Sequence, residues 1–268
     1  QSGERAARGK DDSPGRCPPG MTDEPLSGKT AVVTGASAGI GRATARVLAD
    51  EGANVALAAR REGRLETIAV EIEAEYGTGT LVVPTDVTDE DAVADLVDAT
   101  VAAFGGVDVA VHNAGVGVGP RHYDVADLST EDYRRVQRVN EDGTFYLTRA
   151  VLPHVREAAG HLVYVASYAG QQPRSYDPVY AASKWWMRGF AKSVSSQVGE
   201  ADVGVTVVNP AAVRTEFDVD GQPMSERYGP GEAVDPVEVA ETIAFAAERS
   251  PSMVHEVDVY TRDKLSEI

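Results

Sequence analysis

Short apolar runs rich in β-branched residues recur along the chain from Gly28 onward, and longer stretches with helical spacing separate them. Runs of this length and composition are typical of buried strands. Between Asp89 and Phe104, by contrast, apolar side chains return every third or fourth residue, which predicts an amphipathic helix. Thr88 and Asp91 resemble a capping pair at its start. The predicted strands are Thr30–Thr34, Asn54–Ala59, Thr80–Pro84, Asp108–His112, His161–Ala166, Val203–Val208 and His255–Tyr260.

Strands that alternate with helices and are apolar on both faces indicate a parallel sheet covered on each side. We therefore expect an α/β fold, a single doubly wound Rossmann-type domain of about seven parallel strands, over residues 28–268. Residues 1–27 show no apolar periodicity and predict a flexible leader. A second aperiodic stretch, at about 211–235, is longer than most connections and predicts a substrate lid within the domain.

Charge and cysteine content narrow the classes of partner. The net charge of -17 disfavours binding to nucleic acid or to an anionic membrane surface. No apolar run approaches the roughly 18 residues needed to cross a bilayer. The single cysteine, Cys17, excludes an intrachain disulfide and favours a cytoplasmic location. An acidic excess of this size fits either a high-salt habitat or an ordinary acidic protein.

A glycine-rich turn links the first predicted strand to a helical stretch. Its sequence is Gly-Ala-Ser-Ala-Gly-Ile-Gly, residues 35–41. Glycines at such a turn let the backbone approach a pyrophosphate, and the following helix directs its dipole at the phosphates. A tight structural turn is the alternative interpretation. The residues predicted to hold a dinucleotide here are Gly35, Ser37, Ala38, Gly39, Ile40 and Gly41.

The end of the second predicted strand indicates the type of dinucleotide. An acid about 20 residues after the glycines holds the ribose of NAD, whereas an arginine accommodates the 2′-phosphate of NADP. This position holds Ala59, Arg60 and Arg61, and no carboxylate. We expect NADP, with NAD as the alternative. Arg60 is the first candidate for the phosphate and Arg61 the second, and Ser37 adds a hydroxyl. The other interpretation is a pair of solvated arginines.

Two residues one helical turn apart suggest proton transfer. Tyr180 and Lys184 are spaced i and i+4, which places them on one face of a helix. A tyrosine ordinarily titrates near pH 10, and an adjacent ammonium lowers that value toward working pH. Tyr180 is therefore the candidate general acid and base. Ser167 follows the strand His161–Ala166 and is expected at the carboxyl edge of the sheet, where ligands of such folds bind.

With these residues identified, the chain resembles the short-chain dehydrogenase/reductase family, in its compact NAD(P)-dependent branch, over about residues 26–262. The order and spacing of the motifs, rather than any one of them, carry the resemblance. They are Thr34–Gly41, Asp86-Val87, Asn113-Ala114-Gly115, Asn140, Ser167, Tyr180 with Lys184, and Pro210–Thr215.

The resemblance implies a role for each matching position. Asn140 would hold a water in a proton relay through Lys184 to Tyr180, and Ser167 would hydrogen-bond the substrate oxygen. The remaining positions would hold the cofactor: Asp86 and Val87 at the adenine, Asn113, Ala114 and Gly115 from the fourth strand, and Pro210, Val213 and Thr215 at the nicotinamide end. Two positions depart from the family: His112 replaces a second asparagine, and Ala211 replaces a glycine.

These expectations combine into an oxidoreductase that moves a hydride between NADP(H) and a small carbonyl or alcohol substrate. A cofactor-binding regulatory protein without turnover, and a nicotinamide-using isomerase or lyase, are the alternatives. No metal is expected, because His122, His154, His161 and His255 lack ligand spacing and suit surface or hydrogen-bonded positions.

The substrate walls and the contacts between subunits are less defined. The walls are expected from 116–127, 169–178 and 212–235, segments that vary freely on such folds. The resemblance implies a homotetramer or homodimer formed by the helices at Ser129–Glu157 and Tyr180–Gly199. Trp185 and Trp186 are adjacent and cannot both enter one core, so one is expected to face a neighbouring subunit or the substrate.

Overall fold

A seven-stranded parallel sheet forms the centre of the molecule. The computed structural model describes residues 24–119, 123–219 and 221–263. The strand order is β3-β2-β1-β4-β5-β6-β9, and every neighbouring pair is parallel. This is the Rossmann order, extended by one strand. The predicted strands are all present, with ends shifted by a few residues at most: β1 Thr30–Thr34, β2 Asn54–Ala59, β3 Thr80–Pro84, β4 Val109–His112, β5 His161–Val165, β6 Gly204–Pro210 and β9 Glu256–Val259.

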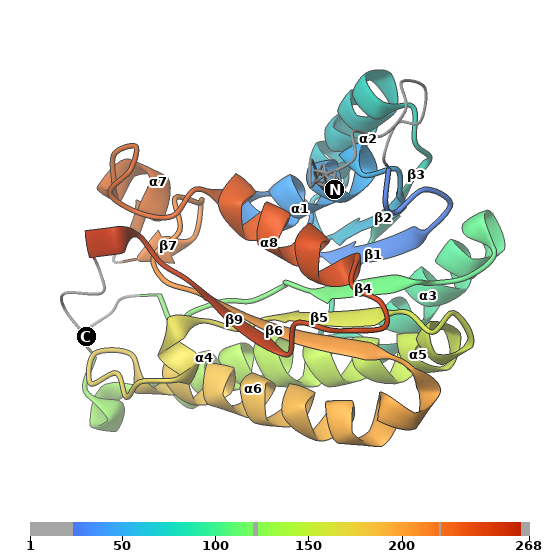
Figure 1. Ribbon diagram of the computed structural model, residues 1–268. Coiled ribbons are helices and arrows are strands. Elements are labelled where there is room, and N and C mark those ends of the chain that lie inside the picture. Colours follow the sequence, from blue (N-terminus) through green and yellow to red (C-terminus); the bar gives the residue numbers. More distant parts are fainter. Residues whose placement is uncertain (1–23, 120–122, 220, 264–268) are drawn as a thin grey trace, which may run out of the picture.

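Helices cover both faces of this sheet, which confirms the predicted fold. On one face lie α1, α2 and α8, and on the other α3, α5 and α6 (Figure 1). A π-helical turn, Arg138–Asp142, joins α4 to α5 without a break. The helices are α1 Gly39–Asp50, α2 Glu62–Tyr76, α3 Glu90–Phe104, α4 Thr130–Gln137, α5 Gly143–Glu157, α6 Pro178–Val198, α7 Met224–Arg227 and α8 Pro236–Ala247.

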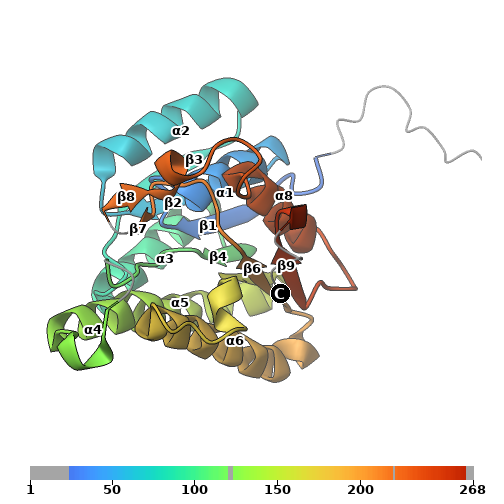
Figure 2. The same cartoon turned by 90° about the vertical axis from the view of Figure 1, so that its left-hand side faces the viewer.

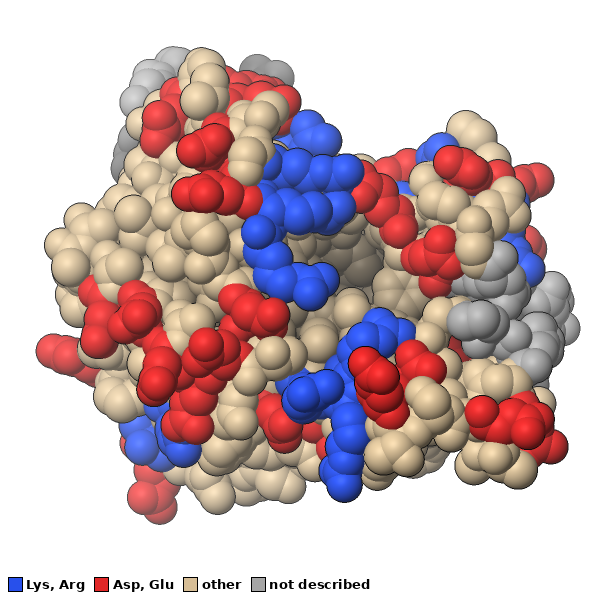
Figure 3. Space-filling model, turned by 180° about the vertical axis from the view of Figure 1, so that it is seen from behind, with Lys and Arg blue, Asp and Glu red and all other residues tan. Residues whose placement is uncertain are grey.

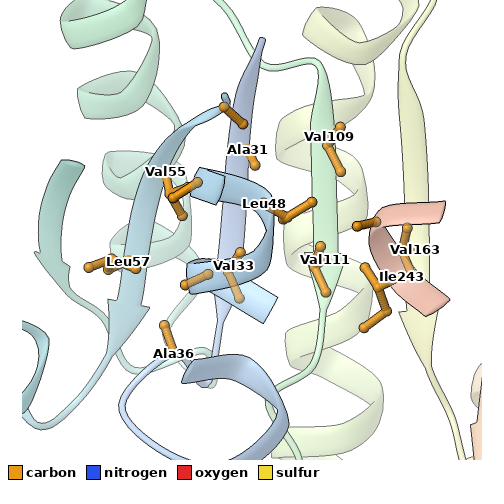
Figure 4. Packing of buried hydrophobic residues seen from close by; sticks show 14 of the residues in the cluster. Ala31, Val33, Ala36, Leu48, Val55, Leu57, Val109, Val111, Val163 and Ile243 are labelled. Atoms are coloured by element: carbon orange, nitrogen blue, oxygen red, sulfur yellow. The ribbon is translucent and has the colours of Figure 1, made fainter. Parts of the chain in front are cut away.

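The core explains why the strands are apolar on both faces. Alternate residues of β1 point in opposite directions, so Val33 joins the cluster under α1 and α8 while Val32 joins the cluster under α3 and α5. Leu48 of α1 and Ile243 of α8 pack on Val33 and its neighbours in β2 and β4 (Figure 4). Small alanines and valines let these helices approach the sheet closely, and this packing fixes the carboxyl edge at which the strands end.

The predicted cap of α3 is wrong by one position. Asp89 caps this helix, and its Oδ1 accepts hydrogen bonds from the backbone N–H groups of Asp91 at 3.0 Å and Ala92 at 3.3 Å. Thr88 instead bonds to Asp86, through both its backbone N–H and its hydroxyl. The aspartate wins because its side chain reaches the second and third N–H groups of the helix from the position just before it.

The segment between β6 and α8 contains more structure than the sequence indicated. It forms a small hairpin, β7 Asp218–Val219 with β8 Gln222–Pro223, followed by α7. Figure 2, which views the carboxyl edge of the sheet, shows this segment projecting beside the start of α2. Val213 and Val234 pair at its base, and Met224 is buried. The segment predicted as a lid is thus a short folded unit, held by the Val213–Val234 pair and by the buried Met224.

The folded domain begins before Gly28. Leu26 is only 3 % exposed, packs in the core, and exchanges backbone hydrogen bonds with Glu51 and Lys29. The predicted leader therefore includes core residues at its end, while residues 1–23, with Cys17, lie outside the described residues, as does His122. Within the described part of the chain, no helix combines the length and apolar character needed to cross a membrane.

Candidate active site

A cavity of about 970 Å³ opens at the carboxyl edge of the sheet. Figure 3 shows a hollow on one face of the molecule with basic side chains gathered along its rim. Only two of the predicted site residues, Gly41 and Asn140, do not line the cavity. The predicted residues that do line it are Gly35, Ser37, Ala38, Gly39, Ile40, Arg60, Asp86, Val87, Asn113, Ala114, Gly115, Ser167, Tyr180, Lys184, Pro210, Val213 and Thr215.

The glycine-rich turn presents an open helix N-terminus to this cavity. Gly35 and Gly39 have positive φ values of 67° and 53°, which side chains rarely adopt. Ala38 caps α1 without a side-chain hydrogen bond, and the first turn of the helix carries no acidic residue. The first N–H groups of α1 are therefore directed at the cavity with no carboxylate in their own turn of the helix, an arrangement that suits a pyrophosphate.

Gly41 acts from behind the turn rather than from the cavity. A Cβ atom there would lie 2.4 Å from the carbonyl oxygen of Gly35 and 2.5 Å from Nδ2 of Asn113. Asn113 also donates from Nδ2 to the carbonyl oxygen of Thr34 at 2.8 Å. The absence of a side chain at Gly41 thus lets the turn, the end of β1 and the end of β4 pack together. This contact holds the cavity floor in shape.

The two arginines after β2 point differently, although both line the cavity. Arg61 donates to Oγ of Ser37 from Nε at 3.1 Å and from Nη2 at 2.9 Å. Arg60 lies near Asp86: burial opposes ionisation of that carboxyl, but hydrogen bonds from Thr88 and the charges of Arg60 and Arg138 lower its pKa overall. The sequence ranked Arg60 first, whereas Arg61 is the arginine that meets the hydroxyl of the glycine-rich turn.

The sequence did not reveal that the lid contacts these arginines. Glu216 accepts from Nη1 of Arg61 at 3.2 Å and from Nη1 of Arg64 at 2.6 and 2.8 Å. Hydrogen bonding to Arg64 makes the largest contribution to the pKa of Glu216 and lowers it. Burial of the carboxyl acts in the opposite direction but is outweighed. Residues 155 positions apart meet here, so no local pattern could have indicated the contact. The pairs tie the lid to the start of α2.

Tyr180 and Lys184 lie on the first turns of α6 and line the cavity together. Nζ of Lys184 lies 5.8 Å from the centre of the Tyr180 ring and donates to the carbonyl oxygen of Val165 at 2.9 Å. Lys184 is only 4 % exposed. Burial disfavours its charged form and lowers its pKa to about 8. An ammonium held this way titrates within the working range of an enzyme.

Asn140 lies behind Lys184, in the π-helical turn, and is fully buried. Its Oδ1 accepts from the backbone N–H of Val116 at 2.9 Å, and its Nδ2 donates to the carbonyl oxygen of Val116 and to Oγ of Ser183. Its amide thus fastens the segment after β4 to α6. A Cβ atom added to Gly115 would lie 3.4 Å from Nζ of Lys184 and 3.5 Å from Oδ1 of Asn140, so these groups are neighbours.

Ser167 stands just past β5, where its Oγ accepts the backbone N–H of Ala169 at 3.1 Å and caps a single 3-10 turn, Tyr168–Gly170. This bond orients the side chain at the edge of the sheet. The hydroxyl hydrogen is still available for donation to a ligand oxygen. Ser167, Tyr180 and Lys184 are therefore lining groups of one cavity, each held by a different element.

Neither departure from the family pattern takes an unusual backbone conformation. His112 is 2 % exposed and stacks on Tyr164 with ring centres 4.3 Å apart. Burial lowers its pKa to about 3, so it is neutral at ordinary pH. Among described residues other than glycine, positive φ values occur at Ala159 and Asp202, so Ala211 takes an ordinary backbone conformation. His161 is hydrogen-bonded to Thr206, as expected.

The other end of the cavity is walled by aromatic and charged side chains. The predicted wall segments do contribute to it, but the sequence could not say which side chains face inward, because loop residues follow no period. The lining residues that the sequence did not single out include Tyr168, Arg174, Tyr176, Asp177, Phe217, Met224, Tyr228 and Tyr260.

Comparisons with known proteins identify the family of this chain. The family described as short chain dehydrogenase matches residues 29–225. An uncharacterized oxidoreductase of Staphylococcus aureus strain MW2 is 31 % identical over 238 residues, which span 88 % of this chain and 98 % of the relative.

Two solved structures are also similar. An alcohol dehydrogenase of the archaeon Thermococcus sibiricus, complexed with 5-hydroxy-NADP, has a TM-score of 0.80 and 30 % identity over 87 % of this chain and 97 % of that one. A 3-ketoacyl-(acyl-carrier-protein) reductase of Brucella melitensis, complexed with NADH, has a TM-score of 0.79 and 29 % identity over 88 % of this chain and 98 % of that one. This chain belongs to the short-chain dehydrogenase/reductase family of oxidoreductases.

Proposed function

We propose that the chain transfers a hydride between NADP(H) and a carbonyl or secondary alcohol carbon, with Tyr180 as the proton donor and acceptor. The observation that carries the proposal is that Ser167, Tyr180 and Lys184 line the same cavity as the glycine-rich turn. The similar structures complexed with NADH and with an NADP derivative support a nicotinamide cofactor.

The residues of the chain have distinct roles in this proposal. The nicotinamide supplies or accepts the hydride when bound. Ser167 donates a hydrogen bond to the substrate oxygen, which stabilises the negative charge that develops there. Tyr180 delivers the proton to that oxygen during reduction. Lys184 favours the phenolate that remains, and Asn140 fastens the segment beside it. Burial of Lys184 keeps water from weakening the effect of its charge.

The lowered pKa of Lys184 predicts a pH dependence. Its ammonium is present below about pH 8 and is lost as the pH rises through this value. Because reduction needs both the tyrosine proton and the neighbouring charge, we expect kcat/KM for reduction to fall above about pH 8. In Lys184→Met the fall should move upward toward the ordinary tyrosine value, on a lower plateau. Lys29 is an exposed lysine just before β1, at the end of that strand away from the cavity. Lys29→Met should therefore keep the wild-type pH profile. If the pH profile of kcat/KM were unshifted in Lys184→Met, the charge of Lys184 would not have the proposed role.

The cofactor choice follows from the charges at the 2′-position of the ribose. Arg61 and Ser37 offer a guanidinium and a hydroxyl that already lie together, and Arg60 adds positive charge nearby. A phosphate with two negative charges would gain charge-assisted hydrogen bonds from such a group. None of the three residues at the end of β2, Ala59, Arg60 and Arg61, carries a carboxylate to hold a 2′-hydroxyl. These features favour NADP over NAD.

Two other functions fit the fold, and one assay separates them. A regulatory protein would bind NADPH without turnover, and an isomerase or lyase would form product without net oxidation. Incubation with NADPH and a panel of ketones and aldehydes, followed by absorbance of the cofactor and product analysis, tests the proposal. Stoichiometric NADPH oxidation is the expected result. Binding of NADPH alone would indicate the regulatory protein instead. Product formed without net NADPH oxidation would indicate the isomerase or lyase.

The proposal extends to association with copies of the same chain. Phe145 of α5 and Trp185 of α6 are 40 % and 45 % exposed, and Trp186 stacks on Phe190, which packs edge-on against Phe145. Exposed aromatic side chains on adjacent long helices suit a homodimeric or homotetrameric interface. Light scattering at micromolar concentration should give a multiple of the 28.3 kDa chain mass. A single-chain mass in both low and molar salt would contradict it. A cytoplasmic location stays a prediction.

A further inference from the structure

The substrate end of the cavity holds an arginine that the proposed hydride transfer does not use. Arg174 lies in the connection between Ser167 and α6, and it lines the cavity together with Ser167 and Tyr180. Of the basic side chains that line the cavity in the described part of the chain, Arg60 and Arg61 lie beyond the glycine-rich turn, and Lys184 lies under Tyr180. Arg174 is thus the basic side chain of the substrate end.

Aromatic rings hold this guanidinium in place. Its central carbon lies 5.1 Å from the ring centre of Tyr168 and 5.3 Å from that of Tyr176. Tyr168 in turn packs edge-on against Tyr260, with ring centres 5.5 Å apart. An arginine supported by aromatic faces loses little side-chain freedom on binding a ligand, and its planar edge carries donors that match a carboxylate. All three tyrosines also line the cavity.

The charges around Arg174 indicate what kind of ligand it would bind. The whole chain carries a net charge of -17, which disfavours anions unless a local cation attracts them. Asp177 also lines the cavity, but it is buried and its Oδ1 accepts a hydrogen bond from the Tyr123 hydroxyl at 3.2 Å. This contact directs its carboxylate toward the segment after β4. Arg174 therefore brings positive charge to the substrate end of an acidic protein, which favours a negatively charged substrate there.

We propose that Arg174 binds a carboxylate of the substrate, so that the enzyme acts on oxo acids or hydroxy acids rather than on neutral carbonyl compounds. The proposal rests on the function proposed above and names the substrate class of that site. Ser167 and Tyr180 would meet the carbonyl oxygen, and Arg174 the carboxylate at the other end of the molecule. A carboxylate is preferred over a phosphate because Arg174 is the one basic side chain at this end of the cavity in the described part of the chain, and a single guanidinium balances the one charge of a carboxylate but not the two of a phosphate.

Matched substrates test the proposal. Succinic semialdehyde and acetoacetate carry a carboxylate, and their methyl esters are neutral compounds of similar shape. Dihydroxyacetone and its phosphate compare a neutral substrate with a phosphorylated one. We expect each acid to exceed its ester by at least about tenfold in kcat/KM, mainly through KM, as for one charge-assisted contact. The phosphate should gain less over dihydroxyacetone than the acids gain over their esters.

Variants assign the preference to Arg174. Arg174→Gln should lower the ratio of acid to ester kcat/KM to about one, and Arg174→Lys should keep part of the preference. Arg249→Gln removes the same charge from a surface residue that does not line the cavity, and should keep the full preference. Raising the salt concentration should weaken the preference in wild type.

The outcomes separate this proposal from the one it rests on. If no carbonyl compound of either kind is reduced, the hydride-transfer proposal fails. If esters and acids are reduced equally well and Arg174→Gln changes neither, hydride transfer stands and the carboxylate proposal is overturned. A preference for the phosphate that exceeds the preference for the acids would overturn the choice of carboxylate. A preference for acids that survives in Arg174→Gln would overturn the role of this residue.

Discussion

Replacing Tyr180 by phenylalanine is expected to reduce kcat by about 10²–10⁴-fold, the usual contribution of a general acid. The substitution removes a single hydroxyl and keeps the ring that packs near Phe217, with ring centres 5.8 Å apart. The fold and the cavity walls should therefore be unchanged. Because the proposal assigns proton delivery to Tyr180, steady-state rates with any accepted carbonyl substrate should collapse.

Two measurements make the Tyr180→Phe result specific. The Kd for NADPH, measured by fluorescence titration, should stay within about threefold of wild type, since the loss concerns the chemical step. Tyr76→Phe changes a half-buried tyrosine of α2 that does not line the cavity, and should leave kcat unchanged. Retention of more than about a tenth of the wild-type kcat in Tyr180→Phe would show that another group transfers the proton.

The second large effect is expected in the choice between NADPH and NADH. Wild type should favour NADPH by at least about tenfold in kcat/KM at moderate salt, equivalent to about 1.4 kcal/mol. Ala59→Asp combined with Arg61→Ile should reverse the order, because a carboxylate at the end of β2 repels the phosphate and accepts the ribose hydroxyl of NAD. Arg61 is chosen for the double substitution because it already contacts Ser37, although Arg60 was the first choice from sequence.

Single substitutions distinguish the two neighbouring arginines from a general charge effect. Arg61→Leu should lose most of the preference and Arg60→Leu less of it. Arg64 lies in the first turn of α2 and contacts Glu216 but does not line the cavity. Arg64→Leu removes the same charge and should lose the least of the preference for NADPH. Equal or better rates with NADH in the wild type would contradict the assignment and leave both arginines as surface charges.

The parallel sheet and the positions of the chemical groups could be predicted because they depend on local patterns. Buried β-branched runs separated by amphipathic helices specify a parallel sheet, and the carboxyl edge of that sheet collects Gly35, Asn113 and Ser167 from β1, β4 and β5. The i, i+4 spacing of Tyr180 and Lys184 follows from a single helix. Each of these inferences needs only short-range periodicity and the topology it implies.

The features that the sequence did not reveal depend on distant residues meeting. The contact of Glu216 with Arg61 and Arg64 joins the lid to α2, and the aromatic setting of Arg174 includes a tyrosine held by β9. The short hairpin of the lid was missed because two-residue strands have no periodicity. The cap of α3 was misplaced because Thr88 and Asp89 are both good capping residues, and only the backbone at Asp89 selects between them.

The transfer of the hydride itself tests the central claim most directly. With NADPH deuterated at both C4 positions and a carbonyl substrate that wild type accepts, mass spectrometry and NMR of the product locate the label. The account predicts one alcohol formed for each NADPH oxidised, with one deuterium on the carbinol carbon, and almost no product from Tyr180→Phe under the same conditions. A product without deuterium at that carbon, or NADPH that binds and is never oxidised by any carbonyl compound, would contradict it.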